Sequence, residues 1–205
     1  SITLNSLLPH RLAAVARQWG GRVIHFSTDC VFDGAKGSYV ETDPSTASDL
    51  YGKTKFLGEV TAMPNALTLR TSIIGRELSE FRSLLEWFLA QEGGAVRGFT
   101  RHLYSGVTTN YLSHLVARLI REHSHLTGLY QLTGHTISKY DLLCDLRDAF
   151  ELNVEIVPDD ADACDRSMIG EKFRTATGIS TPPWPELAAQ LAADPTPYAQ
   201  WRTTQ

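Results

Sequence analysis

The chain has 205 residues and a formal net charge of −4 at pH 7, with 42% hydrophobic and 20% charged residues. This composition is typical of a globular protein with one sizeable core, and the acidic balance argues against a nucleic-acid-binding protein, which would carry a basic surface. No stretch is long and apolar enough to predict a membrane span, and the first residues lack the charged-then-apolar layout of a targeting signal.

The first predicted element is an amphipathic helix over residues 3–19, which a Gly-Gly pair ends. Its apolar side chains recur at helical spacing, at Leu4, Leu8, Leu12, Val15 and Trp19. Residues 22–28 are short and β-rich and predict a buried parallel strand. Residues 29–49 predict a long polar loop, and loops of that length are usually functional.

Helices and strands then alternate along the rest of the chain. The predicted elements are a helix over 49–63, a strand over 66–75, a helix over 83–91, a strand over 93–99, a helix over 109–123 and a strand over 128–134. A capping box at Ser138–Asp141 opens a helix to about residue 150, and a last strand follows over 154–158. From residue 159 the chain is irregular and then proline-rich, with a short Ala/Leu helix near its end. This alternation predicts an α/β fold with a parallel sheet covered on both faces.

One expected feature of a nucleotide-binding α/β fold is absent from the sequence. Such folds open with a strand, a glycine-rich turn and a helix whose N-terminus holds a pyrophosphate, but neither G-x-G-x-x-G nor G-x-x-G-x-x-G occurs here. The chain begins with a helix instead. We therefore expect a partial Rossmann-type, doubly wound sheet that starts in the middle of the fold.

Tyr51 and Lys55 are the first candidate catalytic pair. They stand four residues apart in a predicted helix, so that both side chains project from the same face. A nearby ammonium favours the phenolate and is expected to lower the tyrosine pKa, which would suit a proton donor to an oxygen that gains charge. Taken alone, this spacing is common, and an exposed Tyr and Lys on a solvated helix face are the better explanation of it.

The run Ser27-Thr28-Asp29 supplies the context. It lies at the carboxyl end of a predicted parallel strand, where open α/β sheets bind their ligands. A capping role for Thr28 or Asp29 in the loop backbone is the alternative. The position of the run, just before a long loop and the Tyr51–Lys55 helix, favours a ligand site.

These motifs together resemble one family. STDCVFDG, GSYVETD, YGKTKFLGE and LTLRTS, in this order, are similar to the extended short-chain dehydrogenases/reductases, and within them to the dTDP-4-dehydrorhamnose reductase-like sugar-nucleotide reductases. SGVTT, GLYQLTG, ISKYDLL, DRS and PPWPEL continue the resemblance over nearly the whole chain. It implies that residues 1–100 are the remainder of a dinucleotide-binding domain with the catalytic motif. Residues 101–205 would complete the sheet and form a small C-terminal substrate-binding part.

The resemblance also implies roles for individual residues. Tyr51 would be the general acid, and Lys55 would tune it and hold the nicotinamide ribose. Thr28 would hydrogen-bond the substrate oxygen, with Asp29 beside it in the substrate pocket. Further cofactor contacts would come from Ser27, Thr71 and Ser72, and further substrate contacts from Val31, Phe32 and Arg166.

The expected reaction is reduction of a 4-keto nucleotide-sugar by NADPH or NADH, in deoxysugar and polysaccharide biosynthesis. Cys30 stands where the 4,6-dehydratases of the superfamily carry a second carboxylate, which argues against a dehydratase. The alternatives are an epimerase of the same superfamily, or a non-catalytic sugar-nucleotide-binding or regulatory subunit.

Partners and compartment follow from simpler features. The three cysteines are widely spaced, which indicates reduced thiols in a cytoplasmic protein, and no histidine spacing predicts a metal site. The expected partner is the nucleotide-sugar substrate, with no nucleic acid and no membrane. A sheet that lacks its first strands would expose an unpaired edge, so self-association into a homo-oligomer is also expected.

Overall fold

The computed structural model describes residues 1–79 and 81–198 and divides the chain into two compact units. Unit 1 consists of Ser1–Ser72, Leu119–Thr133 and Cys164–Ser180, and unit 2 consists of the remaining segments, Ile73–Arg118, Gly134–Ala163 and the chain from Thr181 onward. The units are thus built from alternating segments, whereas the sequence predicted two consecutive halves divided at residue 100.

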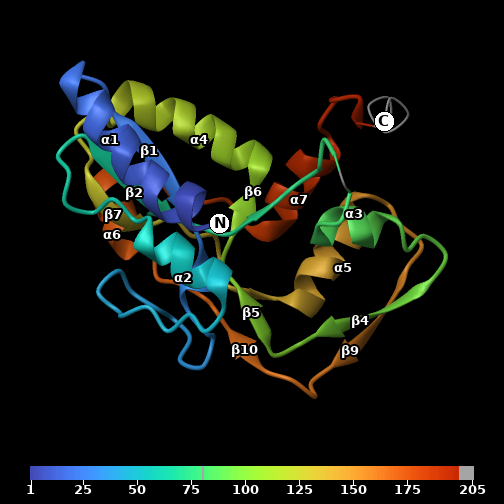
Figure 1. Cartoon of the computed structure of the whole chain (residues 1–205). Helices are drawn as coiled ribbons and strands as arrows, with labels where there is room; N and C mark the ends of the chain where they lie inside the picture. The colour runs from blue at the N-terminus through green and yellow to red at the C-terminus, as the bar shows by residue number, and fades with distance from the viewer. Residues whose placement is uncertain (80, 199–205) are drawn as a thin grey trace. The chain divides into compact units, whose positions relative to one another are not determined.

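Unit 1 contains a parallel three-stranded sheet in the order β1-β2-β7. Its elements are η1 (Thr3–Leu7), α1 (Leu8–Gln18), β1 (Val23–Ser27), η2 (Asp29–Val31), α2 (Leu50–Leu57), β2 (Ala66–Arg70), β7 (Gly128–Gln131), β10 (Cys164–Asp165) and α6 (Glu171–Thr177). Figure 1 shows α1 beside β1 and α6 beside β7. The register pairs Ser27 with Arg70 and Arg70 with Gln131, so the three strands end together.

Unit 2 is built from short strand pairs around a helical core. Its elements are β3 (Ile73–Ile74), α3 (Leu84–Leu89), β4 (Ala95–Phe99), β5 (His102–Tyr104), β6 (Val107–Thr108), β8 (Ile137–Ser138), α5 (Lys139–Ala149), β9 (Glu155–Asp159) and α7 (Trp184–Ala192), while α4 (Thr109–Glu122) crosses the boundary into unit 1. β3 pairs with β6 and β4 with β9, both in parallel, and β5 pairs with β8 antiparallel. The core includes Leu85, Phe88, Leu142, Leu146 and Leu187.

Several predicted elements are confirmed. The strands at 22–28, 128–134 and 154–158 correspond to β1, β7 and β9, and the short Ala/Leu helix near the end corresponds to α7. The capping box is also present, because the Ser138 hydroxyl accepts a hydrogen bond from the backbone N–H of Asp141. The α/β class with parallel strands is therefore confirmed.

The first helix differs from its prediction in the face that it buries. It opens with a π-helical turn, and the apolar stripe that includes Leu4 and Trp19 points outward, with 68% and 84% of these residues exposed. The small residues Ser6 and Ala13 face inward instead. The Ser6 hydroxyl donates to the carbonyl oxygen of Thr54 in α2, so a close polar contact determines which side of the helix is buried.

The helix predicted over 49–63 is shorter than expected and ends at Leu57. A Cβ at Gly58 would collide with the backbone of Asn5, so the chain passes the first helix at close range there. Thr68 in β2 then binds both backbone groups of Val60 and holds the chain out of the helix. The strand predicted over 66–75 likewise divides into β2 and β3, and α6 was not predicted.

Candidate active site

The candidate site lies at the carboxyl end of β1, within unit 1. Thr28 follows β1 in an extended conformation and caps the short helix η2. Asp49 caps α2 by accepting a hydrogen bond from the backbone N–H of Gly52, at 2.8 Å. A Cβ at Gly52 would overlap the carbonyl oxygen of Cys30, so α2 lies directly against the η2 backbone. This close packing brings Tyr51, on the first turn of α2, to the end of β1.

Thr28 links Tyr51 to Asp29. The Thr28 hydroxyl donates to Asp29 Oδ1 at 3.1 Å and accepts from the backbone N–H of Cys30 at 3.2 Å. It is also hydrogen-bonded to the Tyr51 side chain. Thr28 and Asp29 are buried, whereas Tyr51 is 51% exposed.

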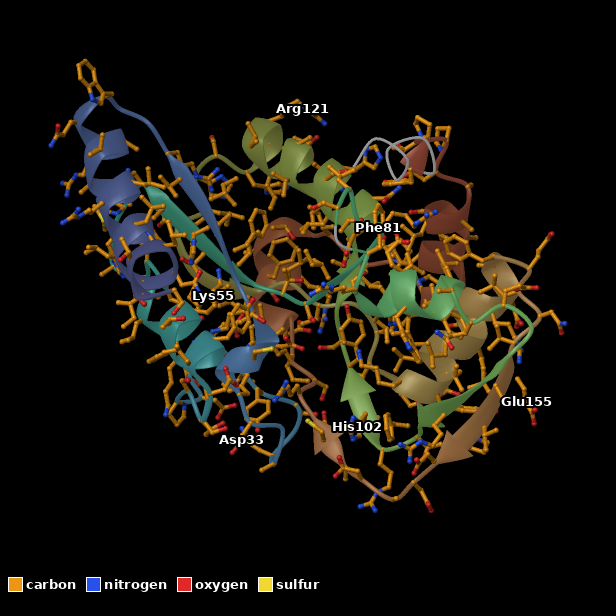
Figure 2. The ribbon with its side chains drawn as sticks, turned by 45° about the vertical axis from the view of Figure 1, so that its right-hand side comes forward. Asp33, Lys55, Phe81, His102, Arg121 and Glu155 are labelled. Atoms are coloured by element: carbon orange, nitrogen blue, oxygen red, sulfur yellow. The ribbon has the colours of Figure 1, made fainter. Side chains whose placement is uncertain are left out.

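The electrostatics of Tyr51 differ from the sequence-based expectation. Burial raises the pKa of the Tyr51 hydroxyl, and the hydrogen bond with Thr28 opposes this rise only in part. Lys55, labelled in Figure 2, is not among the groups that shift this pKa, and its Nζ donates to the carbonyl oxygen of Phe26 in β1, at 2.6 Å. Burial lowers the pKa of Lys55, and the charge of Glu59 opposes that change.

The predicted cofactor contacts lie at the ends of adjacent strands. Thr71 and Ser72 follow β2, and Thr71 is buried with its hydroxyl 3.4 Å from the Ser72 carbonyl oxygen. The Ser27 hydroxyl is already engaged, since it donates to Glu59 Oε1 at 2.6 Å inside the protein. A cofactor contact from the Ser27 side chain would have to break that bond.

Val31 and Phe32 do not fit their predicted role. Both are fully buried, in a cluster with Tyr39 and Met168. The Phe32 and Tyr39 rings are stacked with centroids 4.0 Å apart, and the guanidinium of Arg70 lies 5.2 Å from the Phe32 ring centroid. These side chains therefore hold the loop after Thr28 in the core and do not line a substrate pocket.

Arg166 is far from the other candidates in sequence but close to them in space. Its Nη1 lies 3.7 Å from the sulfur of Cys30, and its charge acts on Asp49. Burial and the charge of Asp29 raise the pKa of the Cys30 thiol, which is the opposite of an activated nucleophile. The structure thus brings together Thr28, Asp29, Tyr51 and Arg166, with Cys30 among them.

A buried ion pair that no sequence motif predicted lies directly beneath this site. Glu59 and Arg70 form two parallel hydrogen bonds, Nε to Oε1 at 2.7 Å and Nη2 to Oε2 at 2.8 Å. Their side chains are 3% and 2% exposed. The sequence feature that could have predicted this pair is Arg70, which stands in the apolar run LTLRTS. A charged side chain in a buried strand requires a partner of opposite charge.

No group of three His, Cys, Asp or Glu side chains that could hold a metal ion occurs among residues 1–79 and 81–198. No helix in that part of the chain is long and apolar enough to cross a membrane.

Comparison with known proteins places the chain in a family. The model of the RmlD substrate binding domain matches residues 1–195. The dTDP-4-dehydrorhamnose reductase of Burkholderia thailandensis is 33% identical over 136 residues, which cover 60% of this chain and 45% of that protein. The methionine adenosyltransferase 2 subunit beta of Danio rerio is 30% identical over 156 residues, which cover 70% of this chain and 48% of that protein.

The chain spans about half the length of these curated relatives. A crystal structure of dTDP-4-dehydrorhamnose reductase from Bacillus anthracis in complex with NADP matches 91% of this chain and 70% of that one, with a TM-score of 0.77 at 21% identity. This likeness confirms a Rossmann-type α/β fold. On the family match over nearly its whole length, the chain belongs to the RmlD substrate binding domain family.

Proposed function

We propose that this chain carries the proton donor and part of the substrate site for the NADPH- or NADH-dependent reduction of a 4-keto nucleotide-sugar. The observation that carries the proposal is the Tyr51–Thr28–Asp29 hydrogen-bond chain at the carboxyl end of β1. Similarity to proteins named dTDP-4-dehydrorhamnose reductase supports the substrate class. A place in polysaccharide biosynthesis in the cytoplasm is part of the same proposal.

The residues present fit the nicotinamide end of such a cofactor. Lys55 Nζ has three N–H donors and uses one on the Phe26 carbonyl oxygen, which leaves two for ribose hydroxyls. Thr71 and Ser72, at the end of the adjacent strand, would lie on the same side. Reduced nicotinamide, when bound, supplies the hydride for the ketone carbon. The pyrophosphate end would need a glycine-rich turn, and this sequence has none.

The protein's part in the chemistry is to hold and deliver a proton. The raised pKa of Tyr51 keeps its hydroxyl protonated at neutral pH, so the general acid carries its proton before the reaction begins. As the ketone oxygen gains charge, Tyr51 would transfer its proton to that oxygen. Thr28 would redirect its own proton from Asp29 to the same oxygen. The phenolate left behind would be reprotonated from water.

The substrate side of the proposal rests on Asp29 and Arg166. Asp29 accepts hydrogen bonds from Thr28 and from the Cys30 thiol and would accept one from a sugar hydroxyl. Arg166 has a buried Nε without a hydrogen-bond partner, and its guanidinium suits the diphosphate of a nucleotide. Substrate contacts from these two side chains remain predictions.

The test is turnover and binding by the chain and its Tyr51→Phe variant. NADPH and NADH binding is followed by nicotinamide fluorescence, and reduction is assayed with 4-keto sugar nucleotides. Loss of a general acid commonly costs about 10²- to 10⁴-fold in rate. We expect kcat to fall within that range in the variant while nucleotide binding is retained. Tyr130→Phe, which changes a tyrosine in β7, is the matched control and should retain turnover.

A second candidate is a non-catalytic nucleotide-binding or regulatory subunit. It is favoured by the similarity to a protein named as a subunit, methionine adenosyltransferase 2 subunit beta. In that case the chain would bind nucleotides without turning over 4-keto sugars, and Tyr51→Phe would change nothing. Binding without turnover in the wild-type chain would therefore favour this candidate over the reductase.

A further inference from the structure

Glu59 lies where three elements of the candidate site meet. It lies two residues after the end of α2 at Leu57, and its buried carboxylate contacts the ends of β1 and β2. Oε1 accepts hydrogen bonds from the Ser27 hydroxyl and from Arg70 Nε, and Oε2 accepts from Arg70 Nη2. Ser27 and Arg70 are the last residues of β1 and β2 and are direct partners in the sheet register. The Glu59 carboxylate therefore links the ends of β1 and β2 to the segment that follows α2.

The residues that the reaction would use come directly after these strand ends. Thr28 follows Ser27, and Thr71 follows Arg70, so neither can move far while Glu59 holds its neighbour. Arg70 also lies against the ring of Phe32, which anchors the loop after Thr28. A bidentate, buried carboxylate–guanidinium pair is geometrically strict, because both hydrogen bonds require one planar arrangement.

We propose that Glu59 is a positioning residue for the candidate active site: its buried carboxylate fixes Thr28 and Thr71 at the strand ends and provides the counter-charge for Lys55. This inference rests on the proposed function, because it assigns Glu59 to the same site. Glu59 touches no substrate or cofactor in this scheme and acts through Ser27, Arg70 and Lys55.

The charge of Glu59 matters because Lys55 is partly buried. Burial lowers the pKa of Lys55, and Glu59 opposes that change. His25 from β1 and His10 from α1 also face this region. Burial and the charge of Lys55 lower the pKa of His25 to about 4, so His25 is neutral where a lysine titrates. Removing the Glu59 charge should therefore lower the Lys55 pKa further.

The first experiment measures this titration directly, with no need for enzyme activity. The sequence has five lysines, so the ¹³Cε signals of a lysine-labelled chain can be assigned with a Lys55→Arg variant. In Glu59→Gln we expect the Lys55 pKa to fall below its value in the wild-type chain, because the opposing charge of Glu59 is removed. In the reductase assay, kcat should fall about 10- to 100-fold with KM nearly unchanged, as expected when reacting groups are misplaced.

The matched control is Glu86→Gln in unit 2. Glu86 is equally buried and is ion-paired to Arg76 at 2.7 Å, so this variant also removes a buried carboxylate from an arginine. If the role of Glu59 were purely structural, both variants would have a lower melting temperature, and the Lys55 pKa and kcat would stay unchanged in both. An unchanged Lys55 titration in Glu59→Gln would overturn the inference, whatever its melting temperature.

A neutral double variant covers the case in which Glu59→Gln does not fold. Glu59→Gln with Arg70→Gln removes both charges of the pair and leaves no lone buried guanidinium. The Lys55 pKa should still fall, because Glu59 is the charge that acts on Lys55. An unchanged value would again overturn the inference. If the wild-type chain reduces no 4-keto sugar nucleotide, the proposed function fails separately, and the Lys55 titration still tests Glu59.

Discussion

Gly52→Ala tests whether α2 is held against η2 by backbone contact. Alanine normally stabilises a helix by about 1 kcal/mol relative to glycine. Here the added methyl group would overlap the Cys30 carbonyl oxygen and lie 2.7 Å from the Ala47 Cβ. Overpacking costs about 1–3 kcal/mol, and two contacts put this case at the upper end. After the helix gain is subtracted, we expect a net loss of about 1–2 kcal/mol.

The assay is thermal unfolding followed by tryptophan fluorescence. For a chain of this size about 1 kcal/mol shifts Tm by about 2–4 °C, so Tm should fall by about 2–8 °C. Lys53→Ala, at an exposed position of the same helix, is the control and should shift Tm far less. Because displacement of α2 would also move Tyr51 away from Thr28, the proposed turnover should decrease. A Gly52→Ala variant that is more stable than the wild type would refute the close packing of α2 on η2.

Three further predictions follow from single groups. The pKa of His25 is lowered to about 4 in the folded chain, so the neutral side chain favours the folded state above about pH 6.5, and this contribution to the free energy of unfolding is lost as pH falls toward 4. Because His25 is partly exposed, the loss should be about 1–2 kcal/mol. An acid titration of the stability of His25→Gln should not show this loss. Ser138→Ala removes the N-cap of α5 and should cost about 1 kcal/mol in denaturant unfolding, whereas no change would mean that the cap is dispensable. Cys30 should react more slowly with iodoacetamide at pH 8 than a free thiol, with a rate that rises with pH; rapid modification at neutral pH would contradict the raised pKa.

The sequence predicted the parts of the structure that depend on local pattern. Alternating apolar strands and helices indicated the α/β fold, and the four-residue spacing of Tyr51 and Lys55 indicated a shared helix face. Thr28 was predicted at the end of a strand, and it does follow the last residue of β1, whereas its role in binding a ligand stays a prediction. The hydrogen bond between Tyr51 and Thr28 is consistent with that reasoning.

The parts that could not be predicted depend on tertiary packing. Spacing shows that the stripe including Leu4 and Trp19 is apolar, but the side of the helix that is buried depends on its contacts with α2. Motif position suggested that Phe32 lines a pocket, but its burial depends on Tyr39 and Arg70. The rise in the Tyr51 pKa depends on local solvent exclusion, which no spacing in the sequence encodes.

The alternating make-up of the two units limits how this chain can be recombined. Its six segments join at five points along the backbone, so the chain passes from one unit to the other five times. No single cut releases either unit as a continuous polypeptide. A substrate-binding part could therefore not be exchanged between relatives by one crossover in the gene.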